Sequence, residues 1–143
     1  MKRAKNKSMS LGSKLALGFG SLGIPFFVTL TLLNYFQPLC PAEGQRTPLL
    51  PPFSKVNGHA YYVMLDTLFV LGDTSENLRR SQLLVCEDKF LLGPAHTILG
   101  DIVGSGGGRF LHWQTQLIFS SSDNTDPNSN GRSYMIVVPN GIK

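Results

Sequence analysis

A run of 22 residues without a charged side chain, from Leu15 to Phe36, constrains this chain more than any other feature of its sequence. A helix that rises about 1.5 Å per residue would extend roughly 30 Å over that length, the thickness of the hydrocarbon core of a membrane. Residues 1–14 before it carry five basic side chains and no acidic one. By the positive-inside rule, we expect residues 1–14 in the cytoplasm, a transmembrane signal-anchor at 15–36, and residues 37–143 outside the cytoplasm.

Two alternatives remain for this segment. A cleaved secretory signal would have a shorter apolar core of about 7–15 residues and a small-residue cleavage site, and the mature chain would then be secreted. Cys40-Pro41-Ala42 has small residues at suitable positions, but Pro41 and the long apolar run disfavour cleavage. A buried helix of a soluble protein would show a polar face, and this run has none. We therefore favour the uncleaved anchor.

The positive net charge of the chain comes from its first fourteen residues. The thirteen basic and nine acidic residues give a formal charge of +4. Five of the basic residues belong to the first fourteen positions, which leaves eight basic against nine acidic residues in the remainder. The short tail accounts for the high isoelectric point, and nothing predicts a nucleic-acid-binding surface.

Prolines separate the membrane segment from the rest of the chain. Five of the nine prolines fall within residues 37–55. Because proline fixes φ and removes a backbone donor, we expect neither a helix interior nor a central strand there. We predict a semi-rigid, proline-rich spacer at 37–57, followed by one small module at 58–143.

The periodicity of this module is that of strands. Aromatic and β-branched residues gather in short runs with turn signals between them, which is typical of an all-β fold, either a small sandwich or an open barrel. Asp88-Lys89 is the turn of a predicted hairpin, and the only candidate helix is a short one within 95–103. The predicted strands cover 60–65 with a continuation at 68–71, 82–86, 90–92, 109–113, 116–119 and 134–138.

The glycine-rich run at 104–108 does not have the features of a phosphate-binding loop. It is followed by Arg109 and lacks both the Lys-Ser/Thr pair of a Walker loop and the third glycine of a dinucleotide fingerprint. We interpret it as a flexible connection. Cys86 lies in an apolar run and is most simply a small hydrophobic residue, while a disulfide with Cys40 in an oxidising compartment stays open.

The three histidines, His59, His96 and His112, are far apart in the sequence and have no metal-ligand spacing. No G-x-S-x-G elbow supplies a hydrolase nucleophile. His96, His112 and Asp101 are candidate catalytic residues on the condition that the fold brings them together.

The most distinctive polar segment is 122–132. Its D-x-N-x-N-G run over residues 126–131 matches the first half of a calcium loop, in which alternating oxygens surround a hard cation. The bidentate Glu of such a loop is absent, because position 137 is Val. The interpretation that we favour is a long hairpin loop, in which Asn and Asp side chains cap the backbone and Gly131 provides a positive φ. The candidate calcium ligands are Asp123, Asp126, Asn128 and Asn130.

The aromatic residues of the predicted strands have two possible roles, sugar binding and core packing. Phe110, Trp113 and Tyr134 would form a sugar-stacking platform if they were exposed, although aromatic residues on strands more often belong to the core.

Three motifs, taken together, resemble a small bacterial module found beside methyltransferase and glycosyltransferase domains in surface-polysaccharide proteins. They are Leu92-Gly93-Pro94-Ala95-His96, the G-x-G-R-F-x-H-W run of 106–113, and the S-D-N-x-D-P-x-x-N-G-R-x-Y run of 122–134. The resemblance implies a polysaccharide context and assigns no activity. Residues 10–20 are similar to the first membrane segment of bacterial chemoreceptors, which implies an inner-membrane anchor.

These observations lead to competing hypotheses of function. The first is a non-catalytic, membrane-anchored binding or accessory module for cell-surface glycans or envelope-assembly proteins, with calcium as the one candidate cofactor. The second is a small enzyme that uses His96, His112, Asp101 and Asp123 across a cleft. A structural product without a ligand is the third. The candidate binding residues are Arg109, His112, Trp113, Asp123, Asn124, Arg132 and Tyr134.

Overall fold

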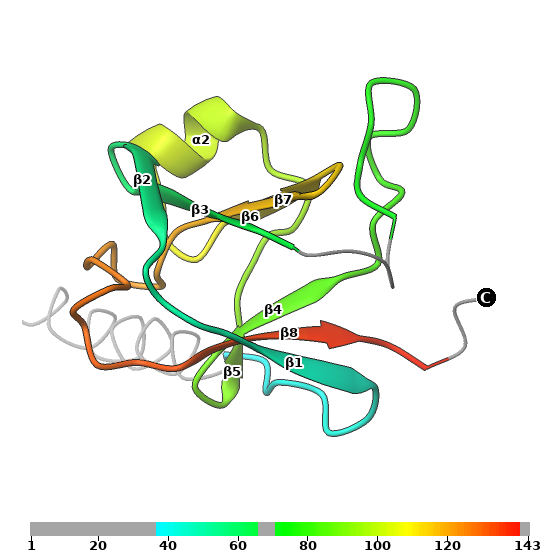
Figure 1. Ribbon diagram of the computed structural model, residues 1–143, viewed down its shortest axis with the longest axis horizontal. Helices are drawn as coiled ribbons and strands as arrows, with labels where there is room; N and C mark the ends of the chain where they lie inside the picture. The colour runs from blue at the N-terminus through cyan, green and yellow to red at the C-terminus, as the bar shows by residue number, and fades with distance from the viewer. Residues whose placement is uncertain (1–36, 66–70, 141–143) are drawn as a thin grey trace, which may run out of the picture. The chain divides into compact units, whose positions relative to one another are not determined.

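The computed structural model describes residues 37–65 and 71–140, and the predicted anchor at 15–36 lies outside them (Figure 1). Strands predominate in these residues, and they form two antiparallel sheets of four strands each. The predicted all-β class is confirmed at this level. In the described part of the chain, no helix is both long and apolar enough to cross a membrane.

The first sheet has the strand order β1-β8-β4-β5. β4 and β5 form the hairpin predicted around Asp88-Lys89. β4 also pairs with β8, so that Glu87 lies opposite Tyr134. The strands are β1 (Gln45–Leu49), β8 (Tyr134–Val138), β4 (Leu84–Glu87) and β5 (Phe90–Leu91).

The second sheet has the order β2-β3-β7-β6. Burial alternates along β6, so Phe110 and His112 point into the protein, while Leu111 and Trp113 are only half-buried. This alternation places one of the candidate histidines on the inner face of a sheet. The strands are β2 (Ser54–Asn57), β3 (Ala60–Met64), β7 (Gln116–Phe119) and β6 (Phe110–Trp113).

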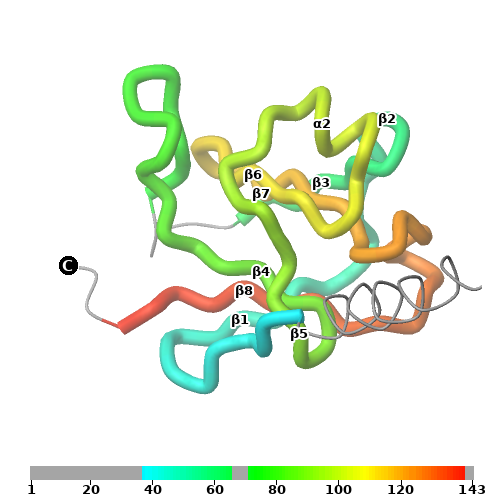
Figure 2. Tube along the Cα trace, turned by 180° about the vertical axis from the view of Figure 1, so that it is seen from behind, coloured from blue at the N-terminus to red at the C-terminus, as the bar shows by residue number. Residues whose placement is uncertain are grey.

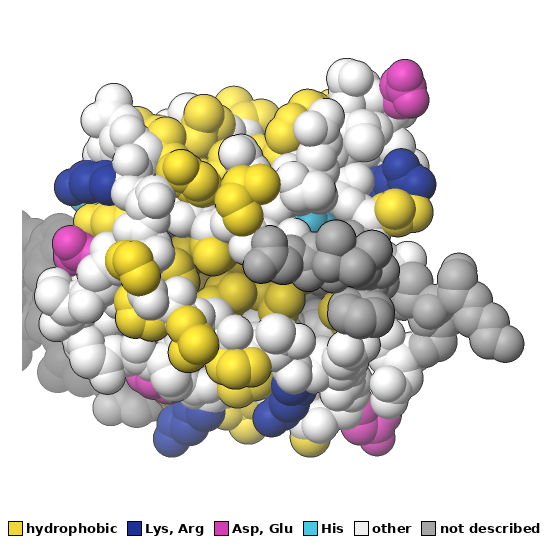
Figure 3. All heavy atoms as spheres, in the orientation of Figure 1, with side chains coloured by type: hydrophobic (Ala, Val, Ile, Leu, Met, Phe, Trp, Pro, Cys, Tyr) yellow, Lys and Arg dark blue, Asp and Glu magenta, His cyan; other side chains and the backbone are white. Residues whose placement is uncertain are grey.

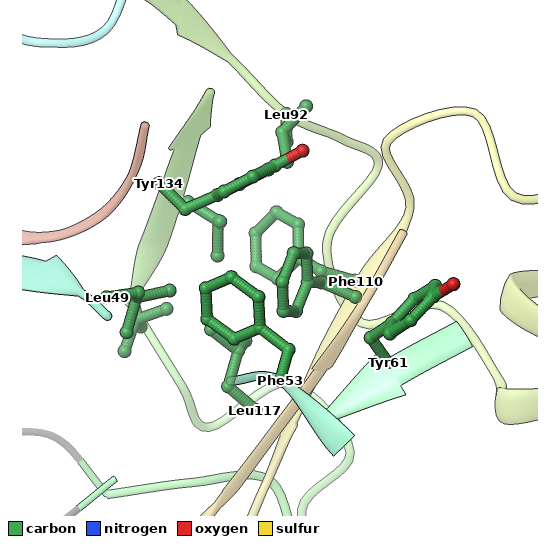
Figure 4. Close-up of a cluster of buried hydrophobic side chains, with 10 residues drawn as sticks. Leu49, Phe53, Tyr61, Leu92, Phe110, Leu117 and Tyr134 are labelled. Carbon is green, nitrogen blue, oxygen red and sulfur yellow. The ribbon is translucent and has the colours of Figure 1, made fainter. Parts of the chain in front are cut away.

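The main hydrophobic core contains side chains from both sheets (Figure 4). Three aromatic rings occupy its middle. Phe53 meets Phe119 edge-on with ring centroids 5.1 Å apart, and Tyr134 lies 5.7 Å from Phe53 and 5.2 Å from Phe119. The two edge-to-face pairs, Phe53–Phe119 and Phe53–Tyr134, add to the free energy gained by burying the rings.

A short helix, α2 (Leu99–Gly104), is shorter than the predicted one. His96 has a φ of +54°, which is outside the helical region, so the helix begins only after it. Ile102 of α2 is buried against Ala60 and Ile118 in a second hydrophobic cluster. Figure 2 shows the chain passing from β5 in the first sheet to α2 beside the second.

The proline-rich stretch is not a spacer, and this corrects the prediction for 37–57. β1 and β2 both lie within it, and β1 pairs with β8 along its whole length. Pro48 is tolerated because β1 is an edge strand, where one missing donor costs the sheet little. The compact unit therefore begins near Pro38, about twenty residues earlier than predicted.

The start of this unit is also tied covalently. Cys40 and Cys86 form a disulfide, which answers the question that the sequence left open. Cys40 donates its backbone N–H to Lys89 at 2.8 Å, and Leu91 donates its N–H to Pro38 at 2.8 Å. The first described residues are thus held against the β4–β5 hairpin.

Candidate functional site

A fully buried carboxylate, Asp73, organises the first polar site. Its backbone pairs with β6, because its N–H donates to His112 at 2.7 Å and its carbonyl accepts from Gln114 at 3.1 Å. Its Oδ1 accepts the backbone N–H of Ser81 at 2.8 Å, and its Oδ2 lies 2.6 Å from Nδ1 of His96. Asp73 thus joins β6, the chain at Ser81 and the segment before α2.

His112 and Ser81 form the second half of this site. The Ser81 hydroxyl oxygen lies 2.7 Å from Nδ1 of His112 and accepts the N–H of Leu83 at 3.3 Å. Burial lowers the pKa of His112, and the nearby Asp73 charge only partly opposes this effect. The ring is therefore neutral at pH 7, and the Ser81 hydroxyl can donate to it. We call Asp73, Ser81, His96 and His112 the Asp73 cluster.

The structure brings together only part of the predicted catalytic set. His96 and His112 both belong to the Asp73 cluster, whereas Asp101 is exposed on α2. Asp123 lies in the loop before β8, where its side chain contacts Thr125 and Arg132. The cleft formed by all four predicted residues is not assembled.

An apolar cleft of about 730 Å³ borders the Asp73 cluster through His112. One wall comes from β1 and β8, with Leu49 and Ile136, and another from Val63 and Leu65 at the end of β3. The polar residues of the lining are Thr74, Arg80, His112, Gln114 and Thr115, together with Gln45 and Thr47 of β1. Hydrophobic side chains gather across the middle of the face that carries β1 and β3 (Figure 3).

A second buried carboxylate, Glu87, organises another polar site. Its Oε1 accepts the hydroxyl of Tyr134 at 2.8 Å and the N–H of Ser122 at 3.2 Å. Its Oε2 accepts the Ser122 hydroxyl and lies 3.1 Å from Arg132, which also contacts Asp123 at 2.5 Å. We call these five residues the Glu87 cluster.

Hydrogen bonds and burial shift the pKa values of three residues in the Glu87 cluster. The hydroxyl of Thr125, assisted by Arg132, holds the pKa of Asp123 at about 2. Hydrogen bonds to Asp123 and Glu87 raise the pKa of Arg132. Burial raises the pKa of Tyr134, so its hydroxyl stays protonated and donates to Glu87. Three predicted binding residues are thereby engaged within the protein.

The predicted calcium ligands also have partners within the protein. Asp126 caps the N–H of Asn128 at 2.9 Å, and Asn128 makes two hydrogen bonds with the backbone of Phe53. Asn130 donates to Tyr134 and accepts the N–H of Arg132. Among the described residues, no three His, Cys, Asp or Glu side chains lie close enough together to hold a metal ion. Calcium binding stays a prediction.

The glycine-rich segment and the following loop hold each other in place. Asn124 accepts the N–H of Gly107 at 2.6 Å and donates to Ser105 at 3.2 Å. Gly106 has a φ of +57°, and a Cβ there would clash with the Asn124 side chain. Arg109 donates back to Gly106 at 2.7 Å. This segment is therefore a turn held by side-chain hydrogen bonds, and two of the predicted binding residues, Arg109 and Asn124, make those bonds.

The aromatic platform is not present as an exposed surface. Phe110 and Tyr134 are 2% and 3% exposed and belong to the main core. Trp113 is half-buried at the end of β6, directly before Gln114 and Thr115 of the cleft lining.

Sequence reasoning missed three residues that organise these sites. Asp73 and Ser81 lie in a polar stretch that looks like an ordinary turn. One sequence signal could have indicated Glu87, because it is an acidic residue that directly follows the apolar run 82–86. No protein-family model, curated protein or solved structure matches this chain.

Proposed function

We propose that this protein is a membrane-anchored, extracytoplasmic, non-catalytic module that binds its ligand in the apolar cleft. The cleft itself carries the proposal. A volume of about 730 Å³ falls within the range of small-molecule sites, and such sites combine apolar walls with a few placed polar groups. The lining has this composition, with Leu49, Val63 and Ile136 beside Thr74 and His112.

Two observations support the extracytoplasmic placement. The uncharged run at 15–36 follows a basic tail, as in a signal-anchor. The disulfide between Cys40 and Cys86 is of a kind that persists in oxidising compartments and is rare in the cytosol. The resemblance to surface-polysaccharide proteins points to the cell envelope, so the ligand that we propose is an envelope glycan that carries an apolar portion.

The single tryptophan of the chain makes this proposal testable without a label. Trp113 is adjacent to His112 and Gln114 of the cleft lining, so an apolar ligand should change its fluorescence. The full chain in lipid nanodiscs would be titrated with a purified glycolipid and with the sugar released from its lipid, against empty nanodiscs. We expect a saturable change with the glycolipid and a weaker one with the sugar.

A matched pair of variants tests whether the signal comes from the cleft. Met64→Arg places a charge on the cleft wall, while Val56→Arg changes another exposed apolar residue of the same sheet outside the lining. Binding should be lost in the first variant and kept in the second. If wild-type protein gives no saturable change with either ligand, the proposal fails.

The Ser81–His112 contact favours an enzyme as a second candidate. A hydroxyl that donates to a neutral imidazole beside a carboxylate is the arrangement of an activated nucleophile. Ser81 is only 5% exposed, which argues for a structural hydrogen bond. Covalent labelling of Ser81 by a fluorophosphonate, absent in Ser81→Ala and His112→Ala, would favour the enzyme. If Ser81 is not labelled, the enzyme hypothesis fails and the binding module remains the proposed function.

A further inference from the structure

The described residues that line the cleft carry fixed charge of one sign only. Arg80 is the only arginine or lysine among the described lining residues, and no aspartate or glutamate is among them. Arg80 is exposed, and none of the ion pairs between described residues involves it. His112 contributes no charge, because its ring is buried and neutral. Among the described lining residues, a ligand in the cleft therefore meets one fixed positive charge.

The polar lining is concentrated on one side of the cleft. Asp73 donates its backbone N–H to His112 and accepts the N–H of Gln114, and these two bonds hold Thr74 beside the β6–β7 turn. The N–H of Leu65 donates to Thr115 at 2.8 Å, which brings the end of β3 to the same turn. By contrast, the wall from β1 and β8 has two polar members, Gln45 and Thr47, beside five apolar ones, Pro48, Leu49, Leu50, Ile136 and Val138.

We infer that the apolar portion of this ligand is a single alkyl chain and that the group at its polar end, which the cleft selects, is a carboxylate. The alkyl chain lies along the wall of β1 and β8, where burial of apolar surface drives binding. The carboxylate lies at the polar side, paired with the guanidinium of Arg80, whose planar donors match a carboxylate. This inference rests on the proposed function and specifies which chemical group the cleft selects.

The test compares an acid with its own ester. The full chain in zwitterionic lipid nanodiscs would be irradiated with a photoreactive hexadecanoic acid or with its methyl ester, and the labelled peptides mapped by mass spectrometry. The label should enter peptides of β1, β3 and β8, with the acid giving about threefold to fivefold more product, as expected for one partly exposed ion pair. Arg80→Gln should reduce labelling by the acid to the level of the ester. Arg79→Gln, a neighbouring exposed arginine outside the lining, should change neither.

The outcomes separate this inference from the proposed function. Equal labelling by acid and ester in the wild-type cleft, or full labelling by the acid in Arg80→Gln, would overturn the headgroup inference and leave the binding cleft standing. Absence of specific labelling in cleft peptides with both probes would overturn both.

Discussion

The two buried carboxylates of this module resemble each other locally and differ in what surrounds them. Glu87 and Asp73 each accept backbone and side-chain hydrogen bonds inside the protein. The partners of Glu87 bind one another as well, and no member of its cluster lines the cleft. The Asp73 cluster borders the cleft through His112. The segment with the most distinctive polar sequence, 122–132, is a loop bound to β4 through Glu87, whereas Asp73, in a segment that resembles an ordinary turn, supports the candidate binding site.

Removing Asp73 should have the largest effect. Asp73→Ala leaves the Ser81 N–H without an acceptor and separates His96 from its partner, which should lower the free energy of unfolding by about 3 kcal/mol. Urea unfolding measures this loss, and Asp101→Ala on the exposed face of α2 is the control. The milder Ser81→Ala should also weaken ligand binding in the cleft. Loss of binding without any loss of stability in Asp73→Ala would contradict the structural role of Asp73.

Changing Glu87 should cost stability alone. In the wild type, Ser122 and Arg132 donate to a carboxylate oxygen of Glu87. In Glu87→Gln these donors face an amide N–H₂ instead, so we expect the free energy of unfolding to fall by about 2 kcal/mol. Ligand binding, followed by Trp113 fluorescence, should stay at the wild-type level. The control is Glu76→Gln, because Glu76 is an exposed residue. A Glu87→Gln variant that binds ligand more weakly would show that the two clusters are coupled.

The loop of the Glu87 cluster depends on a backbone conformation at Gly131. Its φ is +74°, and a Cβ there would meet nothing within 4 Å, so strain alone decides the outcome. Gly131→Val should therefore destabilise by about 1–2 kcal/mol in thermal unfolding, because a β-branched residue resists positive φ. Gly131→Asn should lose clearly less stability, because asparagine adopts a positive φ more readily than valine. Equal losses would point to a cause other than φ.

Acid should loosen the same loop by a small amount. The pKa of Asp123 in the folded protein, about 2, is below its ordinary value of 3.8. A lowered pKa means stabilisation that is present above the ordinary value and is lost as the pH falls through about 2. The stability of the wild type should therefore decline more steeply than that of Asp123→Asn between about pH 4 and pH 2. Parallel curves in acid titrations followed by circular dichroism would contradict this.

Calcium should have the smallest effect. Asp126, Asn128 and Asn130 already serve as hydrogen-bond partners of the loop, so we expect an unchanged melting temperature at millimolar calcium. A calcium-dependent rise that disappears in Asp126→Ala would instead establish the calcium site, and would make the loop a ligand-binding region after all.

The strands could be predicted where the side chains carried the pattern. β6, β7 and β8 are runs of aromatic and β-branched residues, and their predicted ranges agree with the structure to within one residue. β1 and β2 could not be predicted, because their residues are mostly exposed and polar and β1 contains Pro48. An edge strand is specified by its partner more than by its own side chains.

The candidate site was accessible to sequence reasoning only in part. His96 and His112 were chosen for their chemistry, but the residue that joins them is Asp73, and only the fold places it beside both. The segment 122–132 was predicted as a hairpin loop capped by Asx residues, and its caps at Asp123, Asp126 and Asn130 have the predicted form. The hairpin itself is wrong, because the loop joins β7 of the second sheet to β8 of the first, and these two strands do not pair. The loop's anchor to Glu87 spans 35 residues of sequence, and no local pattern encodes it.

Edge strand β1 has a consequence for how this protein behaves when many copies are crowded together. An edge strand offers a row of backbone donors and acceptors to any extended chain that approaches it. Pro48 interrupts that row, since it has no N–H to offer. Pro48, which made the stretch resemble a spacer, thus discourages neighbouring copies from extending the sheet and favours separate modules at high protein concentration.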